Sequence, residues 1–161
     1  ANITDCSVIA DGSGVIASNE RNAVGGIIGW ELENSKEIKN CHVKNLEVTG
    51  WANVGSIAGF MHYGNVMQNC SGENIVLTKT RLGGNPSIGT ACGGWCYSAT
   101  QTTTFKDNTF NNITLNAQSI PYDAANTLYG SEYGGSADIS KIVLDNNTET
   151  NITNNLTIYN P

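Results

Sequence analysis

Two short sequence phrases repeat in strict alternation along this chain, and this repetition limits the possible folds more than any other feature. In the first phrase, a hydrophobic residue is followed by a spacer, then by Asn or Asp, then by Cys or Asn. Its five copies begin at Ile3, Ile38, Met67, Phe105 and Leu144. In the second phrase, a hydrophobic or aromatic residue precedes Gly-x-x-x-Gly. Its four copies begin at Val24, Val54, Ile88 and Tyr129. Fixed alternation of two phrases predicts a stacked, quasi-one-dimensional fold in which each repeat contacts only its neighbours.

The spacing and composition of the repeats favour coils of β-strand. Successive copies of the first phrase lie 35, 29, 38 and 39 residues apart. No stretch shows the helical period, whereas short β-branched segments such as 43–49 and 113–115 recur between Gly, Asn and Asp. One turn of a parallel β-helix with three short strands uses a segment of this length. We therefore predict one all-β domain over residues 1–161, a right-handed parallel β-helix of four to five coils with little or no helix.

The chain is acidic and poor in charged residues. Charged residues make up 14% of the sequence and the formal net charge is −6. An acidic surface disfavours nucleic-acid binding, and no apolar run approaches the roughly 18 residues of a membrane-spanning helix. We therefore predict neither a nucleic-acid partner nor a membrane span. The many Asn, Gly, Thr and Ser residues between regularly recurring hydrophobic residues fit an extracellular protein, and we predict that location.

Four asparagines share one repeat position and are predicted to stack as a ladder: Asn45, Asn74, Asn112 and Asn151. Asn tolerates the left-handed backbone that a sharp corner requires, and its amide can hydrogen-bond to identical amides above and below. We expect Asn112 and Asn151 to be buried in this ladder. A sugar-binding role for the asparagines is the functional alternative.

The five cysteines fall into two groups. Three share one repeat position and are predicted to form a second ladder: Cys6, Cys41 and Cys70. Free cysteines there act as small buried hydrophobic residues, and a disulfide between neighbouring coils is the alternative. Cys92 and Cys96 can form a disulfide only if the two glycines between them fold the segment back, because four extended residues span roughly 13 Å. The cysteine spacing matches no zinc site.

Each Gly-x-x-x-Gly segment has a glycine-rich face. The glycines of the first three copies fall on it: Gly25, Gly29, Gly55, Gly59, Gly89 and Gly93. The fourth copy places Glu132 on the same face, which suggests a flat outer stripe suited to lateral packing. The alternative is a thin core in which large side chains do not fit.

An aromatic residue follows the glycine phrase in three successive coils: Trp30, Phe60 and Trp95. These rings can be interpreted as an exposed stripe that stacks on sugars. Packing at a corner of the coil is the favoured alternative.

The run VGGIIGW at 24–30, followed by IKNCHV at 38–43, resembles the GLUG-type repeats of bacterial and archaeal cell-surface proteins. Residues 54–60 with 67–70 are a second good match, whereas 88–95 and 129–134 match loosely. The resemblance implies right-handed parallel β-helix coils of adhesins and other secreted surface proteins. The chain also resembles, more loosely, the β-solenoid subunits that build the sheath of filamentous methanogenic archaea.

No set of residues in the sequence predicts catalysis, a metal or a cofactor. Pectate-lyase-like β-helices carry a calcium-binding Asp cluster, whereas Asp5, Asp107 and Asp145 fall at turn positions of the repeat. We therefore predict that the protein is not an enzyme.

Both ends of the sequence read as repeat strands without a capping helix. A β-helix exposes unpaired N–H and C=O groups at its ends, and such edges add strands from a neighbour. We therefore predict a structural extracellular protein that self-assembles end to end into a layer, sheath or filament, with flat faces or cysteines linking rows. The alternative is a carbohydrate-binding or adhesive module of a larger surface protein, with cell-surface glycans as partners.

Overall fold

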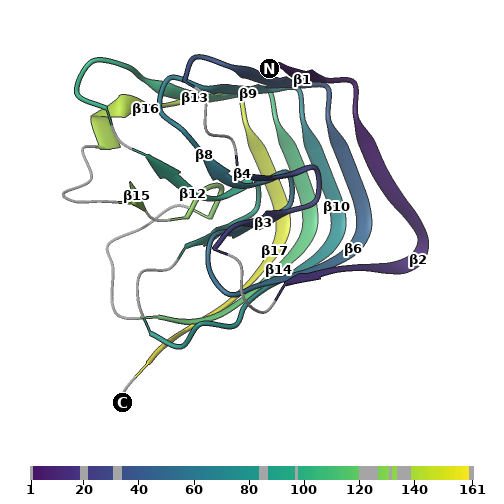
Figure 1. Cartoon of the computed structure of the whole chain (residues 1–161). Coiled ribbons are helices and arrows are strands. Elements are labelled where there is room, and N and C mark those ends of the chain that lie inside the picture. The colour runs from purple at the N-terminus through teal and green to yellow at the C-terminus, as the bar shows by residue number, and fades with distance from the viewer. Residues whose placement is uncertain are drawn as a thin grey trace.

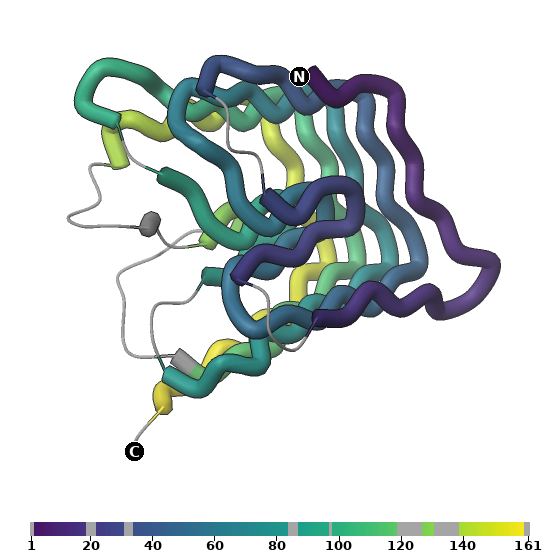
Figure 2. Tube along the Cα trace, in the orientation of Figure 1, coloured from purple at the N-terminus to yellow at the C-terminus, as the bar shows by residue number. Residues whose placement is uncertain are grey.

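The computed structural model describes residues 2–18, 22–30, 34–83, 87–96, 98–119, 127–130, 132–133 and 139–159. These residues form a parallel β-solenoid of about four turns, which confirms the predicted fold class. Successive coils lie side by side, with the purple first coil and the yellow last coil at opposite ends of the stack (Figure 2). Helix in the described part of the chain is limited to one 3-10 turn, η1 (Ile139–Lys141).

Each coil contributes strands to up to four parallel sheets (Figure 1). Sheet A contains β1 (Ile3–Thr4), β5 (Glu37–Lys39), β9 (Val66–Gln68), β13 (Thr103–Lys106) and β16 (Ile142–Asp145). Sheet B contains β2 (Ser7–Ser18), β6 (His42–Gly50), β10 (Ser71–Lys79), β14 (Thr109–Ser119) and β17 (Thr148–Ile158). Sheet C contains β3 (Val24–Gly25), β7 (Val54–Gly55) and β11 (Ile88–Gly89). Sheet D contains β4 (Ile28–Trp30), β8 (Ala58–Met61), β12 (Cys92–Cys96) and β15 (Glu132–Tyr133).

The strand register matches the copies of the first phrase residue for residue. The five hydrophobic residues that begin the phrase are paired in one column across sheet A: Ile3, Ile38, Met67, Phe105 and Leu144. In sheets C and D the first three copies of the second phrase are also in register, with Val54 between Val24 and Ile88.

The fourth copy of the second phrase is displaced by four residues from its predicted register. Tyr129 pairs with Cys92, not with Ile88. Gly130 therefore occupies the level of Gly93, the second glycine of the phrase, and the level of the first glycine falls outside the described residues. The predicted register was wrong because the phrase is defined mainly by glycine. After a long insertion, such a phrase can be aligned with the preceding coil in two ways.

The corners between strands are formed by Asn and Asp with a positive φ, which these residues tolerate better than other non-glycine residues. Nine corner residues have φ between 52° and 59°: Asp5, Asn40, Asn45, Asn69, Asn74, Asp107, Asn112, Asn146 and Asn151. Five of them separate sheet A from sheet B, and the other four bend the long strands of sheet B. The turn chemistry of the sequence thus fixes where each coil changes direction.

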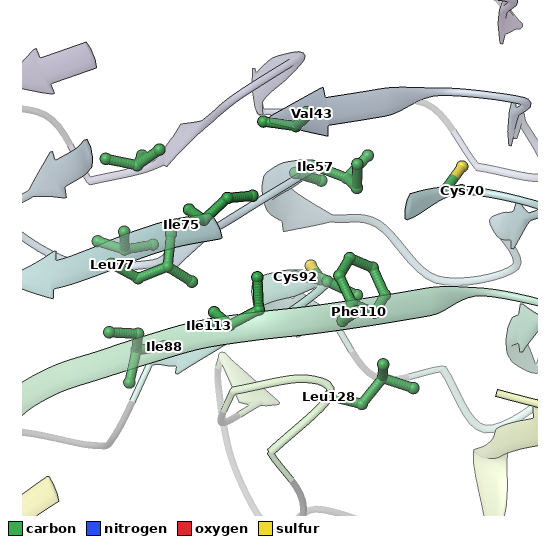
Figure 3. Packing of buried hydrophobic residues seen from close by; sticks show 14 of the residues in the cluster. Val43, Ile57, Cys70, Ile75, Leu77, Ile88, Cys92, Phe110, Ile113 and Leu128 are labelled. Carbon is green, nitrogen blue, oxygen red and sulfur yellow. The ribbon is translucent and has the colours of Figure 1, made fainter. Parts of the chain in front are cut away.

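The core is a set of inward-facing columns that run along the solenoid. In β6 and β10 buried side chains alternate with exposed ones, as a strand with one buried face requires. Ile75 and Leu77 of β10 pack with Ile113 of β14 and with Ile57 and Ile88 from the other side of the coil (Figure 3). Packing between coils therefore buries hydrophobic surface that a single coil would leave exposed.

Candidate functional site

The predicted asparagine ladder is present as a chain of amide hydrogen bonds, but its members lie at the surface. Asn74 Nδ2 donates to Asn45 Oδ1 at 3.0 Å, and Asn112 Nδ2 donates to Asn74 Oδ1 at 2.8 Å. Asn151 departs from this column and donates to Asn111 Oδ1. The expected burial of Asn112 and Asn151 was wrong, because the corner directs both side chains to solvent.

A second ladder, which the sequence did not lead us to predict, follows the corner between sheets A and B and includes Asp5 and Asp107, which were predicted as turn residues. Asn40 Nδ2 donates to Asp5 Oδ1, and Asn69 Nδ2 donates to Asn40 Oδ1. Asn146 Nδ2 donates to Asp107 Oδ1. In every one of these bonds the amide donates toward the N-terminal end of the solenoid, so this ladder has a polarity.

The second ladder is interrupted once among the described residues. Asn69 already uses its amide nitrogen to donate to Asn40, which turns its Oδ1 toward the next coil. The next coil presents Asp107, whose carboxylate has no hydrogen to donate. Two acceptors therefore face each other at this step, and no hydrogen bond joins the Asn69 and Asp107 side chains.

Replacing Asp107 with Asn is expected to complete the ladder and stabilise the fold. The new Nδ2 group would donate to Asn69 Oδ1, and Asn tolerates the φ of 54° at this position. We expect a gain of about 1 kcal/mol, the usual net value of one hydrogen bond. Urea denaturation of the parent and of Asp107→Asn measures this gain in stability. Asp145→Asn is the control: it also removes one negative charge, from the residue that pairs with Lys106. Equal or lower stability of Asp107→Asn would contradict the assignment.

The three cysteines of the second predicted ladder stack at the inner side of the same corner as free thiols. Cys70 Sγ donates to Ile38 O of the preceding coil at 3.5 Å, and Cys41 Sγ donates to Ile3 O at 3.9 Å. Burial is the main cause that raises the pKa of the Cys41 thiol, and it raises that of Cys70 to about 12. Cys6 lies in the first coil and is only partly buried.

Asparagines take the place of cysteine in the last two coils. Asn108 Oδ1 accepts from the Cys70 N–H at 2.9 Å, while its Nδ2 donates to Met67 O at 3.1 Å. Asn147 makes the same pair of bonds to Asn108 N–H and Phe105 O. The exchange of Cys for Asn at this position therefore supplies both a donor and an acceptor to the backbone of the preceding coil.

Cys92 and Cys96 do not form a disulfide. Both lie in the extended strand β12, so the glycines between them do not fold the segment back. Burial raises the pKa of the Cys92 thiol to about 12, and its Sγ donates to Gly94 O. None of the five cysteines forms a disulfide within the chain.

The glycine-rich face is buried, so the interpretation as a flat outer stripe was wrong. Sheets C and D pack back to back, and in the first two phrases the first glycine lies against the second glycine of the next coil. A Cβ atom built on Gly55 would lie 2.2 Å from Ala58 O and 2.7 Å from Gly93 N. These are backbone atoms that cannot move aside, so the thin-core alternative holds. The side chain of Glu132, which suggested the outward orientation, lies outside the described residues.

The three aromatic residues do not form an exposed stripe. Trp30 pairs with Phe60, and their rings stack at 4.3 Å. Trp95, however, pairs with Met61 and therefore faces the opposite side of sheet D, where its ring meets Tyr129 edge to face. Phe60 and Trp95 are only 1% and 2% exposed. The structure therefore offers no three-ring platform for a sugar, and Trp95 is aligned with Met61 because Gly94 occupies the Phe60 position.

Two inward-facing charged residues escaped the sequence analysis. Lys79 is 4% exposed, and its ammonium donates to the carbonyls of Arg81 and Gly83 at 2.7 and 2.8 Å. Desolvation, followed by the charge of Arg81, lowers the pKa of Lys79 to about 8. Through these hydrogen bonds, Lys79 holds the turn after β10 against the end of β10, so its role is structural.

Glu149 takes the column position held by the buried Phe110 in the preceding coil. Its two carboxylate oxygens accept from the Thr90 and Thr127 hydroxyls at 2.5 and 2.7 Å. The residue two positions after the Cys or Asn of each phrase belongs to this inward-facing column. The inward orientation of Glu149 could therefore have been predicted from the sequence. Glu149 replaces apolar packing with two charge-assisted hydrogen bonds at the end of the core.

Among the described residues, nothing pairs with the outer sides of the two long end strands of sheet B. The strand order is β17-β14-β10-β6-β2, so β2 (12 residues) and β17 (11 residues) are its edges. Leu144 in the last coil is 47% exposed, whereas Phe105 in the same column one coil earlier is fully buried. Beside Leu144 lies a hollow of about 280 Å³, also lined by Leu128, Asn146, Asn147 and Glu149. The last coil thus presents an incomplete core layer.

The carboxylates that were assigned to turns remain in structural roles. Asp5 and Asp107 belong to the polar ladder, and Asp145 pairs with Lys106 at 3.1 Å. Among the described residues, no group of three or more His, Cys, Asp or Glu side chains is arranged to hold a metal ion. Nor does any helix in these residues have the length and apolarity needed to cross a membrane.

No protein-family model, curated protein or solved structure matches this chain.

Proposed function

We propose that the protein is a non-enzymatic building block of an extracellular layer, sheath or filament, in which copies join end to end. The observation that carries the proposal is the pair of long unpaired edges, β2 and β17, on one five-stranded sheet. An unpaired parallel edge offers a row of N–H and C=O groups to another strand. A second copy in the same orientation supplies a strand of matching length and direction.

The composition of the last coil supports joining at this end. Leu144, Leu156 and Ile158 are 47%, 36% and 62% exposed. Of these, Leu144 lies in a column that is fully buried in the inner coils, and a further coil would remove it from water. Glu149 enters such a joint with both carboxylate oxygens already hydrogen-bonded, which lowers the cost of covering it.

An extracellular setting is supported by the low charge content and by the resemblance of residues 24–43 and 54–70 to cell-surface repeats. Glycan binding through Trp30, Phe60 and Trp95 is not supported, because two of the three rings are buried. Cys41, Cys70 and Cys92 are buried, and the proposed joint relies on strand pairing.

Replacing Leu144 with Lys is expected to abolish assembly, because the ammonium would stand in the core layer of the joint. Val143 is the matched control: it is 41% exposed on the same strand, but its side chain faces the other way. We expect Val143→Lys to assemble like the parent. Sedimentation velocity over a range of concentrations, with negative-stain electron microscopy in the presence and absence of reductant, distinguishes the variants.

Three results would contradict the proposal. The first is a parent chain that stays monomeric at all concentrations, and the second is assembly of both lysine variants alike. Loss of assembly on reduction would indicate that cysteines, not strand edges, form the joint.

A further inference from the structure

The polarity of the corner ladder between sheets A and B has a consequence for the joint between copies, and this inference rests on the proposed function. The ladder runs through one residue of each coil: Asp5, Asn40, Asn69, Asp107 and Asn146. If a second copy continues the solenoid past the last coil, its Asp5 takes the next place in this column. The residues that meet at the joint are then Asn146 of one copy and Asp5 of the next.

Both groups at that joint are acceptors. Asn146 Nδ2 already donates to Asp107 Oδ1 at 2.8 Å, so its Oδ1 faces the incoming copy. Asp5 accepts from Asn40 Nδ2 at 2.9 Å and, as a carboxylate, has no hydrogen to offer on its other side. A carboxylate against an amide oxygen is mutually repulsive and forgoes one hydrogen bond.

The corner within sheet B offers no substitute donor on the first coil. There Asn45 Nδ2 donates to the backbone oxygen of Ala10, because the first coil has no asparagine at this level. Instead β2 carries a bulge between Ile9 and Gly14. The N-terminal edge therefore meets a neighbour without a ladder amide at either corner.

The chain contains an internal copy of the same arrangement. Asp107 follows Asn69 as Asp5 of a second copy would follow Asn146, and no side-chain hydrogen bond joins Asn69 to Asp107. The flanking strands still pair, with Gln68 opposite Lys106. An Asp above an Asn therefore permits strand pairing and omits only the ladder bond.

We propose that Asp5 sets the strength of the end-to-end joint: a second copy of the chain docks by strand pairing, and the Asp5 carboxylate keeps that contact weak. An amide at position 5 would retain the bond from Asn40 through its oxygen and add a donor toward Asn146. Asn is compatible with the φ of 56° at this position. One additional hydrogen bond and the loss of the repulsion correspond to roughly tenfold tighter association.

The experiment compares the association constants of the parent, Asp5→Asn and Asp11→Asn by sedimentation equilibrium. Asp11 is exposed in the bulge of β2 and does not belong to the corner ladder between sheets A and B, so its replacement removes the same charge without adding a donor opposite Asn146. We expect Asp5→Asn to associate about tenfold more tightly than the parent and Asp11→Asn to match the parent. Circular dichroism establishes that all three chains fold alike.

The other outcomes separate this inference from the proposed function. Assembly of the parent and Asp5→Asn with equal affinity would overturn the role of Asp5 and leave end-to-end joining intact. A gain of the same size in Asp11→Asn would show a net-charge effect and would also overturn it. Monomers for all three chains would overturn both the joint and the function that it serves.

Discussion

Gly93→Ala is expected to lose more than about 3 kcal/mol of unfolding free energy, one of the two largest effects anticipated for this chain. A Cβ atom on Gly93 would lie 2.1 Å from Val54 N and 2.2 Å from Asn53 C. Both are backbone atoms of a neighbouring coil, so the clash is relieved only by separating sheets C and D. Urea denaturation followed by circular dichroism measures the loss, which is a large part of the stability of a small domain.

Gly12→Ala is the control for this experiment. A Cβ on Gly12 meets no heavy atom within 4 Å, and its φ is not positive. We expect unchanged or slightly higher stability, because alanine restricts the unfolded chain more than glycine does. A tolerated Gly93→Ala would mean that sheets C and D are not packed back to back.

The second large effect is a loss of stability above pH 9 that depends on Cys70. Burial raises the pKa of this thiol from 9.0 to about 12, so the folded state holds a proton that the unfolded state releases first. The stability contributed by the protonated thiol is complete below pH 9 and declines as pH rises toward 12. Between pH 9 and 11 we expect Cys70 to account for roughly 2 to 3 kcal/mol of the decline.

Urea denaturation at half-unit steps from pH 7 to 11 tests this with Cys70→Ala, which lacks the titrating group. The variant is expected to be less stable than the parent at pH 7, and the gap should close as pH rises. Ser71→Ala, next to Cys70 with an outward side chain, should retain the alkaline slope of the parent. Parallel curves for the parent and Cys70→Ala would show that the thiol is not buried. Lys79, with its lowered pKa, contributes in the opposite direction between pH 8 and 10.5 in all three chains.

Much of the candidate site followed from local chemistry that the repeats make visible. Asn45, Asn74 and Asn112 were placed correctly in one column because a positive φ and a self-complementary amide both favour asparagine there. Their burial was misjudged, since repetition shows that residues stack but not on which side of the backbone they lie. For the same reason Asp5 and Asp107 were predicted only as turn residues, and the ladder that they form with the asparagines of that corner was missed.

A one-residue difference in spacing invalidated the predicted alignment of the aromatic residues. Trp95 follows its glycine by two residues and Phe60 by one, which moves Trp95 to the opposite face of sheet D. A one-residue difference reverses a side chain because the period of a strand is two. Only the pairing of whole strands reveals which of the two faces each ring occupies.

The coil length, the register of sheets A and B and the residues at each corner could be predicted from the sequence, because these depend on hydrophobic spacing and on turn conformations local to a few residues. Three features could be recognised only in the folded chain: the glycine face lies inside, Glu149 and Lys79 point into the coil, and the corner ladder donates in one direction. Those features depend on what lies across the coil or in the next one. Their energies come from close backbone packing and hydrogen bonds between segments 20 to 60 residues apart.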